Sequence, residues 1–114
     1  MAIEWAPGQR ERVQALLTRH PAPSGRCESA ARGILPIGRE RDLNAQIWRL
    51  DPAEGRYVVP RARLEFPWFY HLTVETEAHC VDALTGVDGT SRASYLDEHW
   101  TEADAILWIA ESEG

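Results

Sequence analysis

The sequence contains no lysine. Its twelve basic residues are all arginines, and with 18 acidic residues they give a formal net charge of −6. Without a lysine, catalysis through a Schiff-base lysine is excluded. The negative charge argues against non-specific nucleic-acid binding, which needs a basic surface. We therefore expect no nucleic-acid partner and a surface that attracts cationic regions of a protein or peptide.

Long apolar runs and cysteines are also scarce. No apolar run approaches the roughly eighteen residues that span a bilayer, and residues 1–8 lack the basic start and apolar segment of a signal peptide. We therefore expect no membrane partner and a chain that is cytoplasmic as synthesised. The two cysteines, Cys27 and Cys80, are too few for a disulfide scaffold, so reduced thiols are expected.

The remaining composition is that of an ordinary globular domain. Of the 114 residues, 44% are hydrophobic and 26% are charged. This length accommodates one hydrophobic core but leaves little room for a second. We expect a single domain over residues 1–114.

Helical patterns come first along the chain. Residues 7–20 form a first helix, in which Val13, Leu16 and Leu17 follow helical spacing. A second helix is expected from an N-cap at Ser24 to about Leu35, ended by Pro36 and Gly38. These two helices make up a helical part over about residues 7–36, which a charged connector follows at 38–43.

The rest of the chain favours strands. Residues 44–50 and 56–64 are candidate strands, a hairpin follows, and 87–92 is expected to be a loop. Residues 94–100 predict a short helix or turn, and 102–111 a final helix or strand. The sheet is expected over about 44–86 and the C-terminal element over about 94–111. The predicted fold is α+β, with helices packed on three to five antiparallel strands.

The hairpin places two polar side chains together. Its strands are residues 69–75 and 78–84, joined by a turn at Thr76-Glu77, so His71 is predicted to lie directly across from Asp82. Because side chains alternate along strands, one face is apolar and the other carries His71, Thr73, Glu75, Cys80 and Asp82. Cross-strand neighbours are about 4.5–5.5 Å apart at Cβ, close enough for an imidazole to hydrogen-bond to a carboxylate.

Cys27 is the candidate nucleophile for this pair. It is expected at the third position of the second helix, where backbone N–H dipoles favour a thiolate, and Arg26 adds a cation. His71 would accept the proton and Asp82 would orient the imidazole. The N–H groups of the same helical turn could stabilise an oxyanion.

Other interpretations remain open. Cys27 could be a small core residue, His71 a satisfied structural histidine, and the five tryptophans simple packing residues. A zinc site of Cys27, His71, His79 and Cys80 ranks lower, because no CxxC pair exists and His79 and Cys80 point to opposite faces. A Cys27–Cys80 disulfide would need an oxidising compartment. His79 is a weaker candidate base than His71, because it shares a face with Val81.

Four segments resemble the papain-fold toxin domains of bacterial polymorphic toxin systems. Residues 25–35 (GRCESAARGIL) look like the cysteine-bearing helix of that family. Residues 70–74 (YHLTV) and 78–86 (AHCVDALTG) are similar to its strands with histidine and with aspartate, and 95–100 (YLDEHW) to its tryptophan-containing tail. The resemblance implies a papain-like minimal core and a Cys27–His71–Asp82 triad without a cofactor. It also implies delivery into a target cell and an immunity protein that covers the cleft.

The activity implied is that of a papain-like cysteine hydrolase or acyltransferase acting on a protein or peptide carboxamide. Water would resolve the acyl-enzyme in a peptidase or glutamine deamidase, and an amine would do so in a transglutaminase-like enzyme. The family's glutamine before the cysteine is replaced by His20-Pro-Ala-Pro-Ser, so His20 or backbone amides would serve the oxyanion. The alternatives are a non-catalytic protein-binding module on the same scaffold and a transglutaminase-like leader-peptide protease.

Overall fold

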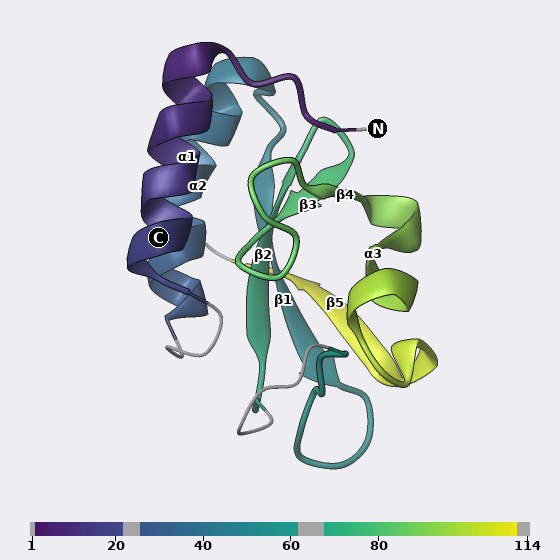
Figure 1. The fold of residues 1–114 in the computed structure, drawn as a ribbon. Coiled ribbons are helices and arrows are strands. Elements are labelled where there is room, and N and C mark those ends of the chain that lie inside the picture. Colours follow the sequence, from purple (N-terminus) through teal and green to yellow (C-terminus); the bar gives the residue numbers. More distant parts are fainter. Residues whose placement is uncertain (1, 22–25, 62–67, 112–114) are drawn as a thin grey trace.

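The computed structural model describes residues 2–21, 26–61 and 68–111, and these fold into three α-helices around a five-stranded sheet. The elements are α1 (Pro7–Arg19), α2 (Cys27–Arg41), β1 (Gln46–Pro52), β2 (His71–Thr76), β3 (His79–Val81), β4 (Thr90–Ser91), α3 (Arg92–His99), the 3-10 turn η2 (Ala103–Ala105) and β5 (Ile106–Ala110). Neighbouring strands are antiparallel in the order β4-β3-β2-β1-β5. The predicted α+β class is confirmed. In Figure 1, α1 and α2 cover one face of the sheet and α3 lies on the other.

The helices differ from prediction mainly in α2. The expected N-cap, Ser24, lies outside the described residues, and Cys27 is the first helical residue rather than the third. The helix also continues through Pro36 to Arg41, so the predicted end near Leu35 and the connector at 38–43 were wrong. Pro36 removes one helical hydrogen bond, but continuing the helix buries Ile37 and Gly38 against the sheet. None of the described helices is long and apolar enough to cross a membrane.

At Gly38, α2 lies close against Thr76 of β2. A Cβ built at this position would collide with the Thr76 hydroxyl oxygen. We therefore expect Gly38→Ala to lower the free energy of unfolding by about 1–3 kcal/mol, as other overpacked sites do. Gly8→Ala is the matched control, because its Cβ would meet nothing within 4 Å. Urea unfolding of both variants tests this, and equal stabilities would contradict it.

The β2–β3 hairpin has a different register from the predicted one. Its turn residues are Glu77 and Ala78, both with positive φ (50° and 62°), and Val74 pairs with Val81. The predicted turn at Thr76-Glu77 was therefore one residue too early, and His71 does not lie directly across from Asp82. The observed register differs from the predicted one by two residues. His71 and Asp82 therefore still lie on the same face of the hairpin, because side chains return to a face at every second residue.

Elements after β3 complete the sheet beyond the predicted limit of residue 86. The expected loop at 87–92 contains β4 and the first residue of α3, and residues 94–100 belong mostly to α3. The apolar run near the C-terminus is β5, which pairs with β1. Of the expected strand 56–64, Val58 and Pro60 form isolated bridges, and the part beyond Arg61 lies outside the described residues.

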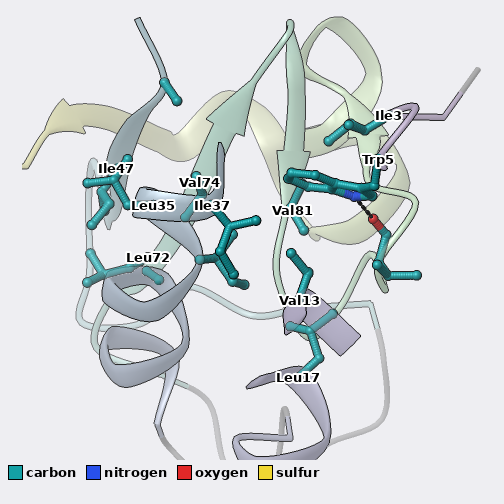
Figure 2. Close-up of a cluster of buried hydrophobic side chains, with 14 residues drawn as sticks. Ile3, Trp5, Val13, Leu17, Leu35, Ile37, Ile47, Leu72, Val74 and Val81 are labelled. Atoms are coloured by element: carbon teal, nitrogen blue, oxygen red, sulfur yellow. Dashed lines mark hydrogen bonds between the residues drawn. The ribbon is translucent and has the colours of Figure 1, made fainter. Parts of the chain in front are cut away.

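Two hydrophobic cores sandwich the sheet. The first, under α1 and α2, gathers residues such as Val13, Ile34 and Val74; Figure 2 shows it with Trp5, whose indole N–H donates to the Val87 carbonyl oxygen at 2.7 Å. The second lies on the α3 face and consists of Leu50, Val58, Cys80, Tyr95, Trp100 and Ile106. On the polar face of the hairpin, His71, Thr73, Cys80 and Asp82 are buried as well, so the histidine and aspartate lie inside the protein.

Candidate functional site

Cys27, His71 and Asp82 line one pocket of about 200 Å³. The pocket lies where β3 stops. On β2, β3 pairs with Val74–Thr76, and no other described strand pairs with the His71 end of β2 on that side. Residues from the start of α2 and the end of α1 line the same pocket. The fold thus brings together the three residues that the sequence analysis selected.

The His71 ring is buried and held in a fixed plane. Its side chain is 2% exposed, and Nε2 lies 3.1 Å from Asp82 Oδ2. Trp68 stacks on the ring at a centroid distance of 5.0 Å and an interplanar angle of 12°, and Trp100 packs at 5.2 Å from another direction. These contacts leave the imidazole little freedom to rotate.

The Asp82 carboxylate accepts hydrogen bonds on both oxygens. Oδ1 accepts the backbone N–H groups of Leu84 (2.8 Å) and Thr85 (3.0 Å), and Oδ2 accepts the Tyr95 hydroxyl (2.5 Å) in addition to His71. Burial alone would raise the pKa of Asp82, but the hydrogen bond and charge of His71, together with the Tyr95 hydroxyl, lower it to about 2. Asp82 is therefore a fixed anion at neutral pH.

The charge of Asp82 acts on His71 in return. Burial alone would lower the pKa of His71, but its hydrogen bond to Asp82, its polar contact with Cys27 and the charges of both groups raise it to about 9. With Nε2 directed at Asp82, the ring nitrogen left for the thiol is Nδ1. Among the described residues Nδ1 has no partner of standard hydrogen-bond geometry, and long or misaligned contacts are common in catalytic pairs before substrate binds.

Cys27 is half-buried at the first turn of α2. Burial would raise the pKa of its thiol, but the polar contact with the nearby His71 ring, the charge of that ring and the backbone of Leu72 outweigh burial and lower it. Cys80 contrasts with it, because burial and the nearby Asp82 raise the pKa of that thiol. The site therefore favours a thiolate–imidazolium pair at Cys27 and leaves Cys80 an inert thiol.

Several residues of the site were missed by the sequence analysis. Trp68 and Trp100 pack against His71 rather than serving only as general packing residues, and Tyr95 binds Asp82. Tyr95 and Trp100 fall in the segment likened to a family tail, but no local pattern indicates which side chain reaches the site. His20 was a candidate for the oxyanion; it lines the pocket, and its buried Nδ1 has no hydrogen-bond partner among the described residues.

The disulfide, the zinc site and the alternative base His79 were the other interpretations of these residues. Cys27 and Cys80 are both free thiols, so the disulfide interpretation was wrong. Within the described ranges no group of three or more His, Cys, Asp or Glu residues is arranged to hold a metal ion. His79 is absent from the described pocket lining, and its Nδ1 lies 2.8 Å from the Glu77 carbonyl oxygen beside the hairpin turn.

Comparisons with protein-family models, with curated proteins and with solved structures gave no match for this chain.

Proposed function

We propose that this protein is a papain-like cysteine hydrolase or acyltransferase that acts on a carboxamide of a protein or peptide. The observation that carries the proposal is the buried His71 imidazole, bonded to Asp82 through Nε2 and coupled to the Cys27 thiol in the same pocket. A nucleophile, a base and a group that orients the base are the parts that acyl transfer needs. Peptidase and glutamine deamidase activities share this chemistry.

The reaction would run through a thioester. The Cys27 thiolate attacks the carbonyl carbon, and His71 then donates its Nδ1 proton to the departing nitrogen, which leaves as an amine or as ammonia. Water next adds to the thioester while His71 takes its proton, and cleavage of the carbon–sulfur bond releases the carboxylic acid and the thiolate. In the transglutaminase-like variant an amine replaces this water. Asp82 keeps the imidazole oriented throughout.

Two groups near Cys27 could stabilise the oxyanion. The first hydrogen bond of α2 joins the Ala30 N–H to the Arg26 carbonyl at 3.1 Å, so the amides of residues 27–29 lie before the helical ladder and carry the positive end of the helix dipole. His20 lines the pocket from the end of α1. Both features support the proposal, because a tetrahedral intermediate needs N–H donors at its oxygen.

The described pocket wall indicates which substrates to try. Trp68, Phe69, Tyr70, Ala30 and Ala83 line it, and Phe69 is 69% exposed. Peptides with an apolar or aromatic side chain beside the carboxamide would bury that side chain on this wall. If the protein acts as a toxin or effector, a dedicated immunity protein would bind over the same pocket.

Thiol reactivity tests the proposal without knowledge of the substrate. At pH 6, a thiol with the ordinary pKa of 9.0 is only about one part in a thousand thiolate. We expect iodoacetamide to modify Cys27 at least tenfold faster than a cysteine-containing peptide, and Cys80 more slowly than the peptide. Mass spectrometry of tryptic peptides gives both rates, and ammonia release and cleavage are then screened with apolar glutamine peptides.

Slow and equal modification of the two cysteines would overturn the proposal. That outcome would favour the non-catalytic binding module, in which Cys27 and His71 serve only the structure. A reactive Cys27 that cleaves only in the presence of a leader-binding partner would instead favour the leader-peptide protease.

A further inference from the structure

Tyr95 is a buried polar group that the triad chemistry leaves unused. It comes from α3, on the opposite side of the sheet from Cys27, and its side chain is fully buried. Its hydroxyl donates to Asp82 Oδ2 at 2.5 Å, the same oxygen that lies 3.1 Å from His71 Nε2. Burial and the charge of Asp82 raise the pKa of Tyr95 well above 10, so the hydroxyl remains a neutral donor.

We propose that Tyr95 is a positioning residue that limits how firmly Asp82 holds the proton on His71. Two donors that share one carboxylate oxygen compete for its negative charge. The second oxygen offers His71 no substitute, because the amides of Leu84 and Thr85 already bind Oδ1. The Tyr95 hydroxyl therefore keeps the imidazolium acidic enough to give its proton to the leaving nitrogen, as a general acid must.

The groups around His71 come from several parts of the described chain. Asp82 follows β3, Cys27 begins α2, and both interact with the ring. Trp68 and Trp100 pack on it without charge. Cys80 lies on the same face of the hairpin in neutral form, and His20 lines the pocket from the end of α1. Tyr95 is thus the described donor that reaches this carboxylate from the α3 side.

Histidine NMR tests the inference directly. Tyr95→Phe keeps the ring and removes only the hydroxyl. In protein labelled with ¹³C-histidine, we expect the titration midpoint of His71 to rise by about half a pH unit or more, because Asp82 then directs its charge at the imidazolium alone. His71→Asn assigns the signal among the four histidines. Tyr57→Phe is the control, because that tyrosine is 45% exposed. The titration midpoint of His71 should not change in this variant.

A second measurement keeps the inference testable if Tyr95→Phe folds poorly. Uniform 3-fluorotyrosine makes every tyrosine hydroxyl a stronger donor, so the His71 midpoint should fall in the otherwise unchanged protein. An unchanged midpoint in both experiments would show that Tyr95 serves only packing. A fall in Tyr95→Phe, or a rise with 3-fluorotyrosine, would also overturn the inference.

The inference rests on the proposed function, because that function requires His71 to donate a proton. The two proposals can nevertheless be overturned independently of each other. Slow alkylation of Cys27 would overturn the proposed function while leaving the effect of Tyr95 on His71 measurable. A reactive Cys27 together with an unmoved His71 midpoint would overturn the role of Tyr95 alone. If both hold, the alkaline limb of kcat/KM against pH should move upward in Tyr95→Phe.

Discussion

Replacing His71 by Asn is expected to slow the alkylation of Cys27 at pH 6 by at least about tenfold. The polar contact with His71 and the charge of its ring are what overcome the burial of the thiol. Without them, burial holds the pKa of Cys27 at or above 9.0, and the thiolate fraction at pH 6 falls to about one part in a thousand or less. Any peptide hydrolysis by the wild-type protein should fall by about 10³-fold or more, since members of a catalytic unit act together.

His79→Asn is the matched control for this experiment. His79 is also a hairpin histidine, but it lies beside the turn and outside the described pocket lining. Its replacement should leave the alkylation rate of Cys27 within about twofold of wild type. Equal rates in wild type and His71→Asn, with both proteins folded by circular dichroism, would remove His71 from the site.

Asp82→Asn is expected to cost about 3 kcal/mol of unfolding free energy near pH 6. The change removes one charge of a buried pair whose side chains are 2% and 5% exposed, and losing one member leaves the other charge uncompensated. Asp88→Asn is the control, because the Arg10–Asp88 pair is about half exposed, and such pairs contribute little. Urea unfolding of the two variants measures the contrast, and a loss no larger than that of Asp88→Asn would contradict it.

The two pKa shifts also predict how the stability of the protein changes with pH. The pKa of His71 is raised from 6.5 to about 9, so its stabilising contribution is fully present below pH 6.5 and is lost as the pH rises through about 9. The pKa of Asp82 is lowered from 3.8 to about 2, so its contribution is present above pH 3.8 and is lost as the pH falls toward 2. The pair should therefore stabilise most between about pH 4 and 6.5.

This profile is best measured with Cys27→Ala as the background. The lowered pKa of Cys27 makes the folded thiol release a proton in the range where folded His71 retains one, and the two effects would offset each other. In that background, stability should decline between pH 6.5 and 9. Adding Asp82→Asn should remove or reverse the decline, because burial then lowers the pKa of His71. An unchanged slope would show that Asp82 does not hold the His71 proton.

Local patterns in the sequence were sufficient to select three side chains that the structure brings into one pocket. Alternation along two short strands put His71 and Asp82 on one face, and this survived a register difference of two residues because the side-chain period is two. The start of a helix near Cys27 was predictable from the Pro- and Gly-containing segment before it and the apolar spacing after it. Both features depend on residues adjacent in the chain, as did the α+β class.

The hairpin register shows where local patterns fail. Glu77 and Ala78 form the turn with positive φ, although neither is a residue that favours it. The turn is instead held from outside the hairpin: the Glu77 N–H donates to Asp42 Oδ2 at 2.9 Å, and its carboxylate pairs with Arg41. Both partners lie at the end of α2, which no pattern within the hairpin could predict.

The sequence by itself therefore determined the fold class, the choice of Cys27, His71 and Asp82, and the face that the last two share. Tertiary structure decided that α2 continues past Pro36, that β5 pairs with β1, and that Trp68, Trp100 and Tyr95 enclose the His71–Asp82 pair. The physical reason is the range of the interactions. Periodicity and helix initiation are set by neighbours in the chain, whereas the shared oxygen of Asp82 joins side chains that only the packing of α3 against the sheet brings together.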